Sequence, residues 1–210
     1  MNEDFSKLLS PFQFPVSGIQ VDNRIVMAPM TTFSGNEDGI VSDDELSYYK
    51  ERNRGAGLLI SACAYVTPQG KAFPGQFSAY SDDMLPSLKR LAAALKENGG
   101  KAVLQIHHGG RMCPPELVPG GEPLSASAVA PVREGAVTPR EMTELEIEET
   151  IAAYGEAARR AVESGFDGVE IHGANTYLIQ QFFSPHSNRR TDKWGGTLER
   201  RMTFPLAVVD

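Results

Sequence analysis

The sequence has few cysteines and no long hydrophobic run. Cys63 and Cys113 are the two cysteines among 210 residues, and their separation does not suggest a zinc or iron–sulfur ligand set. We expect both to be free thiols, as in a cytoplasmic protein. No window approaches eighteen apolar residues, and the first residues lack a basic stretch followed by an apolar core. We therefore expect neither a membrane span nor a secretion signal.

A basic stripe is also missing. The chain has 20 Lys and Arg against 27 Asp and Glu, a net charge of −7, and its basic residues are scattered. We therefore expect neither nucleic acid nor an anionic membrane as a partner. The chain is 41% hydrophobic, enough for one sizeable core, and the prediction is a single domain.

Four short apolar runs recur along the chain, each bounded by polar or turn residues. They are mostly continuous rather than alternating, which is typical of parallel strands buried on both faces. The runs are RIVMAP at 24–29, GLLISACA at 57–64, AVLQIHH at 102–108 and GVEIHG at 168–173.

Helical patterns lie between these runs. Ser42 and Ser81 precede acidic residues and predict N-caps, and Thr143 with Glu146 predicts a capping box. The alternation of strand and helix requires a parallel sheet, either doubly wound or closed as a TIM (β/α)8 barrel. Glycines predict the helix ends, at positions 55, 99 and 165.

The residues that follow the apolar runs favour the barrel. No Gly-x-Gly-x-x-Gly follows the first run, which weighs against a dinucleotide-binding doubly wound sheet. Small and polar residues follow each run instead, where barrel enzymes have their active sites. Residues 109–140 lack periodicity, and we expect a long loop over the active face. A last amphipathic run from Thr197 completes about four of the eight βα units of a barrel.

Three polar residues, His172, Asn175 and Tyr177, follow the fourth run with small residues between them. Two neutral donors can polarise a carbonyl group and hold a developing enolate oxygen, and a nearby phenol can deliver a proton. Each residue also has a structural explanation: a core histidine, a turn asparagine in the left-handed conformation, and an aromatic residue that starts a helix.

Four motifs spread over the chain point to one family. They are NRIVMAPMT, PQG, QIHHGGR and GFDGVEIHGANTYLIQQFFSPHSNRRTDKWGGTLERR. Together they resemble the Old Yellow Enzyme family of FMN-dependent ene reductases, or NADH:flavin oxidoreductases. The resemblance implies that residues 1–210 are the N-terminal half of a single FMN-binding TIM-barrel domain. It also implies an enzyme that uses NADH or NADPH to reduce the C=C bond of α,β-unsaturated carbonyl compounds.

The resemblance implies a flavin side of the site. Pro29, Met30 and Thr31 would line the flavin, with the Thr31 hydroxyl at flavin O4. Cys63 would touch the flavin from the second strand, and Gln105 would bond its pyrimidine edge. Gln105 is also explained as an interior amide that ties strands together, and Cys63 as a small buried hydrophobic residue.

The resemblance implies a substrate side as well. His172, beside the flavin, and Asn175 would bind the substrate carbonyl oxygen, and Tyr177 would protonate the α-carbon after hydride reaches the β-carbon. Phe33 stands where some relatives carry a substrate-facing tyrosine. Other motif residues are interpreted as loop structure: His107, His108, Arg111 and His186, and the ion-paired loop of Arg189, Arg190, Asp192 and Trp194.

Half a barrel would expose two strand edges and an apolar interior. The sequence leaves three interpretations of this half barrel open: a fragment of a longer protein, a truncated pseudo-enzyme, or a half that pairs with another chain. We favour the fragment. The alternative function is therefore a truncated, non-catalytic half barrel that self-associates or pairs with another chain, and a homo-oligomer is open in either case. A metal-dependent barrel hydrolase ranks last, because only His108 and His172 stand at strand ends, and we predict no metal site.

Overall fold

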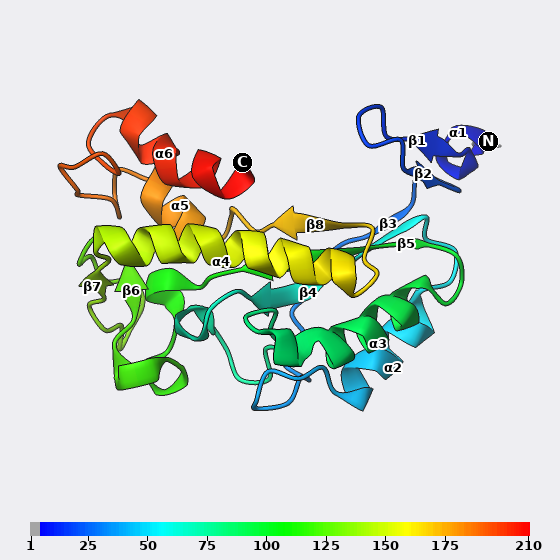
Figure 1. The fold of residues 1–210 in the computed structure, drawn as a ribbon, viewed down its shortest axis with the longest axis horizontal. Helices are drawn as coiled ribbons and strands as arrows, with labels where there is room; N and C mark the ends of the chain where they lie inside the picture. Colours follow the sequence, from blue (N-terminus) through cyan, green and yellow to red (C-terminus); the bar gives the residue numbers. More distant parts are fainter. Residues whose placement is uncertain (1–4) are drawn as a thin grey trace.

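A four-stranded parallel sheet forms the centre of the computed structural model, which describes residues 5–210 (Figure 1). Its strand order is β3-β4-β5-β8, and each strand falls within or overlaps one of the four predicted runs. The parallel sheet predicted from the sequence is therefore confirmed. The strands are β3 (Val26–Met27), β4 (Leu58–Tyr65), β5 (Lys101–His107) and β8 (Gly168–Ile171).

Helices connect these strands in the predicted alternation. The connecting helices are α2 (Asp43–Arg52), α3 (Leu85–Lys96) and α4 (Glu144–Glu163), and α5 (Leu178–Phe183) and α6 (Leu198–Val209) follow β8. The remaining elements are α1 (Ser6–Leu9), the antiparallel pair β1 (Phe12–Gln13) and β2 (Gln20–Val21), and the parallel pair β6 (Leu124–Ser125) and β7 (Arg140–Glu141). Short 3-10 helices span Pro68–Gly70, Asp82–Met84, Gly110–Met112, Pro115–Leu117 and Pro119–Gly121. No helix within residues 5–210 is long and apolar enough to cross a membrane.

Two of the three predicted helix caps are confirmed. The Ser42 side chain accepts a hydrogen bond from the Glu45 amide, and Thr143 and Glu146 form both bonds of a capping box. The prediction for Ser81 is wrong, because its side chain makes no capping bond and a 3-10 turn intervenes before α3. Pro86 explains the difference: proline favours the first turn of a helix, and α3 begins at Leu85.

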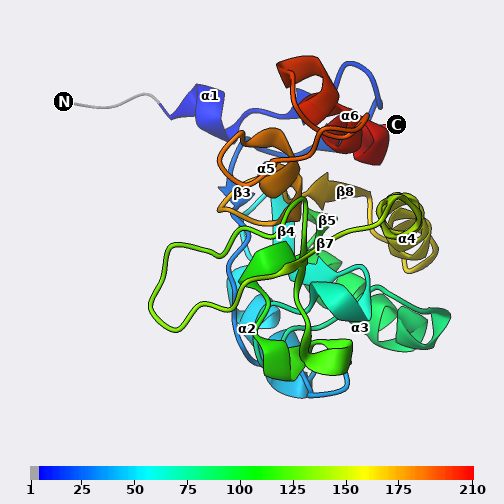
Figure 2. The ribbon, with the colours of Figure 1, turned by 90° about the vertical axis from the view of Figure 1, so that its left-hand side faces the viewer.

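Helices α2, α3 and α4 lie on one side of the sheet (Figure 2). Their apolar faces and the sheet enclose the core, in which Leu59, Leu88, Leu104 and Tyr154 are almost fully buried. The expectation of strands buried on both faces is wrong at the two edges. Both residues of β3 and all four of β8 keep some exposure, since in residues 5–210 no helix covers the second face there.

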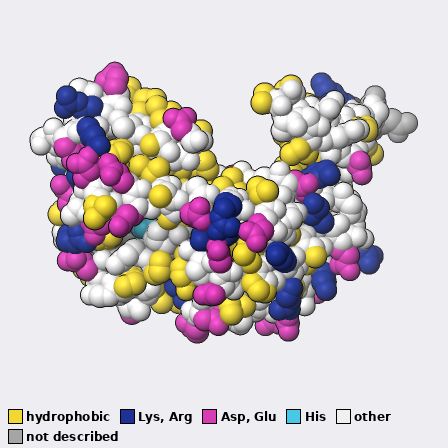
Figure 3. Space-filling view, viewed as in Figure 1, with side chains coloured by type: hydrophobic (Ala, Val, Ile, Leu, Met, Phe, Trp, Pro, Cys, Tyr) yellow, Lys and Arg dark blue, Asp and Glu magenta, His cyan; other side chains and the backbone are white. Residues whose placement is uncertain are grey.

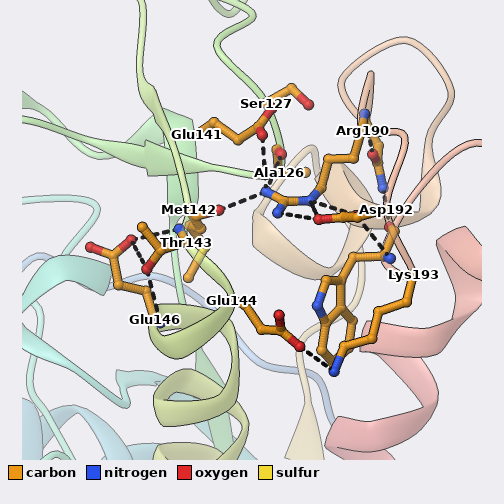
Figure 4. A network of polar contacts seen from close by, with 12 residues as sticks. Ala126, Ser127, Glu141, Met142, Thr143, Glu144, Glu146, Arg190, Asp192 and Lys193 are labelled. Carbon is orange, nitrogen blue, oxygen red and sulfur yellow. Dashed lines mark hydrogen bonds and ion pairs between the residues drawn. The ribbon is translucent and has the colours of Figure 1, made fainter.

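The segment 109–140 lies at the carboxyl ends of the strands, which face the viewer in Figure 2. It contains three 3-10 turns and β6, and β7 begins at its last residue, so it is more ordered than the predicted loop. Arg190 joins the loop after α5 to this segment and to the residue after β7: its guanidinium donates to the Ala126 and Met142 carbonyl oxygens at 3.2 and 2.6 Å (Figure 4).

The loop around Arg190 is ion-paired, as predicted. Arg190 is buried and lies 2.6 Å from Asp192 and 3.4 Å from Glu141. Asp192 also accepts a bond from the Trp194 amide. The prediction is wrong for Arg189: its exposed side chain forms no ion pair with any of the described residues and donates to the His186 carbonyl oxygen.

Candidate active site

An open pocket of about 280 Å³ lies at the carboxyl ends of β5 and β8. Five residues that the sequence assigns to the site meet in it: Pro29, Thr31, Gln105, His172 and Asn175. The other lining residues are Glu170, Ile171, Gly173 and Ala174. Because Gly173 and Ala174 are small, backbone atoms form part of the pocket wall. Met30, Phe33, Cys63 and Tyr177 do not line this pocket, and Met30 and Phe33 are mostly exposed.

Strand register aligns the flavin-side candidates across the sheet. Cys63 on β4 pairs with Gln105 on β5, and Gln105 pairs with Glu170 on β8. The Gln105 amide nitrogen donates to a Glu170 carboxylate oxygen at 2.7 Å. Because a carboxylate only accepts, this bond fixes the nitrogen toward Glu170 and leaves the amide oxygen free to accept. Gln105 thus ties two strands together, as its structural explanation expects, and also lines the pocket.

Glu170 is a pocket residue to which the sequence analysis gave no role. It stands two positions before His172, so alternation along a strand places both side chains on the same face. This two-residue spacing is the sequence signal that could have identified Glu170 as a site residue.

Cys63 is buried, and desolvation raises its pKa to about 12, so the group beside Gln105 is a neutral thiol.

His172 is held as a neutral hydrogen-bond donor. Burial is the main cause that lowers its pKa below the ordinary value of 6.5, against smaller opposing effects of its own backbone and Glu170. The Ala174 amide donates to Nδ1 of His172 at 3.4 Å. Nδ1 is therefore the acceptor nitrogen, and Nε2 carries the proton in the neutral ring.

The turn after β8 positions Asn175 and Tyr177. Asn175 and Thr176 have φ angles of 54° and 65°, in the left-handed region that asparagine tolerates better than most residues. Gln180 accepts from the Thr176 amide and Gln181 donates to the Thr176 carbonyl oxygen, which holds this turn against α5. Tyr177 occupies the N-cap position of α5. The structural explanations of Asn175 and Tyr177 are correct, and Asn175 still lines the pocket.

Three aromatic rings, those of His107, His172 and Tyr177, contact one another beside the pocket. Ring centroids lie 4.3 Å apart for His107 and Tyr177, 5.0 Å for His172 and Tyr177, and 5.2 Å for the two histidines. The Tyr177 ring is nearly perpendicular to both imidazoles. Burial raises the pKa of Tyr177. Tyr177 is therefore protonated at neutral pH, as a proton donor must be.

The neighbouring His108 is a structural residue, in line with its interpretation from the sequence. It is buried, and its Nδ1 accepts from the Gly110 amide at 3.0 Å. Desolvation lowers its pKa to about 3. Within residues 5–210, no group of three or more His, Cys, Asp or Glu side chains is placed to hold a metal ion.

We predict that the free energy of unfolding falls between pH 7 and pH 5, partly because of His108. Its folded pKa lies below the unfolded value of about 6.5, so only the unfolded chain binds a proton there. The stability from His108 is complete above pH 6.5 and is lost toward pH 3, and the loss by pH 5 is about 2 kcal/mol. Urea unfolding at several pH values measures it.

The control for this prediction uses two asparagine variants. His108→Asn keeps an acceptor for the Gly110 amide but cannot titrate, so it should weaken the pH dependence. His186→Asn, at an exposed histidine, should leave the pH dependence as it is. Equal slopes in His108→Asn and the parent chain would contradict the prediction.

Comparison with known proteins identifies the family. Residues 7–210 match the model of the NADH:flavin oxidoreductase / NADH oxidase family. The chain belongs to this family. It is 53% identical over 210 residues to the probable NADH-dependent flavin oxidoreductase YqiG of Bacillus subtilis, covering all of this chain and 56% of that relative. It therefore spans little more than half the length of that relative.

Two further members of the family extend the comparison. The NADH:acrylate oxidoreductase of Vibrio harveyi is 56% identical over 193 residues, which are 92% of this chain and 19% of that protein. The solved structure of an old yellow enzyme homologue from Zymomonas mobilis is 32% identical, with a TM-score of 0.88 over 96% of this chain and 58% of that chain. The resemblance to Old Yellow Enzyme and the prediction of an N-terminal portion of a TIM barrel are confirmed.

Proposed function

We propose that this chain carries the flavin-ring and substrate side of a site that reduces the C=C bond of α,β-unsaturated carbonyl compounds with NADH or NADPH. The observation that carries the proposal is the meeting of Thr31, Gln105, His172 and Asn175 in one pocket. The Vibrio relative is named for acrylate, an α,β-unsaturated carboxylate. The substrate class that we propose for this chain is an enone or a related acceptor.

The donor set of the pocket suits the edge of a flavin ring. Gln105 and Thr31 offer an amide and a hydroxyl, which can pair with the alternating N–H and carbonyl groups of a flavin pyrimidine edge. No Lys or Arg lines the pocket, so these residues fit the neutral ring rather than the phosphate. In the proposal Pro29, Met30 and Cys63 complete the flavin side. When bound, FMN supplies the hydride chemistry.

The residues beyond β8 then act on the substrate. The Nε2–H of His172 and the amide of Asn175 bind the carbonyl oxygen and stabilise the negative charge that develops on it, at about 3 kcal/mol per donor. Tyr177 gives its phenol proton to the α-carbon. Phe33 packs 4.9 Å from Phe73, ring to ring, and in the proposal its exposed face lies against the substrate.

Binding of FMN by the purified full chain tests the proposal. We expect yellow protein that retains FMN through gel filtration and whose reduced flavin is reoxidised by acrylate or an enone. Gln105→Leu removes the amide and should weaken FMN binding by about fivefold, since one hydrogen bond contributes about 1 kcal/mol. Fluorescence titration with FMN measures the change, and Gln69→Leu, outside the pocket, is the matched control.

The competing function is a non-catalytic half barrel that associates with itself. It is favoured by apolar side chains left exposed on β3 and α6, including Val26, Leu206 and Val209. Figure 3 shows the molecule hollowed between α6 and the β1–β2 hairpin, with hydrophobic side chains along the walls. A colourless chain that elutes as an oligomer would favour this function over the oxidoreductase.

Three broader expectations belong to the same proposal. We propose that residues 1–210 form part of a single FMN-binding domain rather than two domains. A homo-oligomer is compatible with the exposed apolar side chains of α6. A cytoplasmic location accords with Cys63 and Cys113, which are both free thiols.

A further inference from the structure

A buried glutamine, Gln76, fixes the proton of a buried histidine beside the proposed proton donor. Gln76 is 1% exposed and His107 is fully buried. The Gln76 side-chain oxygen accepts from the Ala72 amide at 2.8 Å. Its nitrogen donates to the Cys63 carbonyl oxygen and lies 3.1 Å from Nδ1 of His107. A flipped amide would set donor against donor at Ala72 and acceptor against acceptor at Cys63, so this orientation is determined.

The orientation of Gln76 decides the tautomer of His107. The amide nitrogen can only donate, so Nδ1 of His107 accepts and the single proton of the neutral ring resides on Nε2. The ring is neutral because burial, with the nearby His172 and His108, lowers its pKa well below 6.5. Among the described residues, Nε2 is buried without a hydrogen-bond partner. An unsatisfied buried N–H is costly and calls for an explanation.

The His107 ring lies closest to Tyr177 among its aromatic neighbours. Their centroids are 4.3 Å apart at an interplanar angle of 86°, against 5.2 Å for His172 and 6.5 Å for Phe73. A hydrogen-bond donor next to a phenol forms its strongest bond after the phenol has lost its proton and become a phenolate. Charge-assisted hydrogen bonds are about twice as strong as neutral ones.

We propose that His107 is a positioning residue for Tyr177: its Nε2–H donates a hydrogen bond to the Tyr177 oxygen as that group gives up its proton. The O–H bond of Tyr177 breaks as the C–H bond at the substrate α-carbon forms, and the phenolate that remains is bound by His107. His107 keeps its own proton, and water restores the phenol. The inference rests on the role of Tyr177 in the proposed function. It assigns to Gln76 the task of keeping the donor nitrogen of His107 free.

The tautomer is tested first, on the full chain without flavin. Nitrogen NMR of ¹⁵N-histidine-labelled protein, assigned with His107→Gln, should show Nδ1 of His107 unprotonated and Nε2 protonated from pH 8 to pH 6. A proton on Nδ1, or a mixture of both tautomers, would overturn the inference. The tautomer is read from the parent chain, and the variant serves only to assign the signals.

Two variants at position 107 then separate hydrogen bonding from packing. The side-chain nitrogen of His107→Gln falls near the position of Nε2, whereas His107→Asn keeps only the acceptor that faces Gln76. The pKa of Tyr177, followed by NMR of ¹³C-labelled tyrosine and assigned with Tyr177→Phe, should rise by about one pH unit in His107→Asn. In His107→Gln it should stay near that of the parent chain, and His108→Gln should leave it unchanged.

The outcomes are distinct from those of the proposed function. Equal Tyr177 pKa values in the two His107 variants, or a change that follows side-chain volume, would reject the hydrogen bond. If the hydrogen bond is found but the protein neither binds FMN nor reduces an enone, the proposed function fails and the His107–Tyr177 contact stands. If both succeed, reoxidation of the reduced flavin by an enone should be slowed about tenfold in His107→Asn and much less in His107→Gln.

Discussion

Alanine at both His172 and Asn175 should reduce the reaction of the flavin-loaded protein with an enone by about 10⁴-fold. Both side chains line the same pocket, and His172 is a neutral donor through Nε2. Each donor contributes about 3 kcal/mol to the stabilisation of the developing oxyanion, and a tenfold rate change corresponds to about 1.4 kcal/mol. Enone binding should be lost, while reduction of the flavin by NADH or NADPH is largely retained.

Stopped-flow absorbance of the flavin measures the two half-reactions separately. The matched control is His186→Ala with Asn36→Ala, since both residues are exposed and neither lines the pocket. This control should react with the enone at the parent rate. An unchanged enone affinity in the His172 and Asn175 double variant would reject the assignment of the oxygen-binding pair.

Replacing Arg190 by methionine should lower the free energy of unfolding by about 3 kcal/mol. The buried guanidinium bridges the loop after α5 to the residues directly after β6 and β7 through the carbonyl oxygens of Ala126 and Met142, and it pairs with Asp192 (Figure 4). Hydrogen bonds from a charged group contribute about 1.5 to 3 kcal/mol each, and the carbonyl oxygens would lose their donor. The partner carboxylate is partly exposed, so water compensates part of its loss.

The neighbouring arginine provides the control for this prediction. Arg189→Met removes a side chain of the same type from the same loop, but that side chain is exposed. Surface substitutions of this kind change stability by about 0.5 kcal/mol or less. Chemical denaturation of both variants measures the difference, and a loss below about 1 kcal/mol in Arg190→Met would show that the bridge has little effect on stability.

Local signals in the sequence predicted most of the secondary structure. Continuous apolar runs identified all four strands of the sheet, and the capping box at Thr143 identified the start of α4. The failure at Ser81 has a local cause that the sequence also contained, since Pro86 allows α3 to begin one turn later. Strand periodicity would likewise have placed Glu170 on the face of His172.

The position of the protons in the site needed the three-dimensional structure. The proton of His107 is placed by Gln76, which lies 31 residues earlier in the chain and meets His107 only when β4, β5 and the intervening loop pack together. The orientation of the Gln105 amide depends in the same way on Glu170, 65 residues later.

Apolar continuity and helix capping act over a few residues, so they can be recognised along the chain, and the family motifs fix which side chains follow each strand. A tautomer or an amide orientation depends instead on which donor or acceptor faces it within about 3 Å. Folding brings that partner from a distant segment, and no spacing in the sequence encodes the distance. The strand–helix order could therefore be predicted from the chain, which also supplied the candidate site residues, whereas the hydrogen-bonding state of those residues was decided by packing.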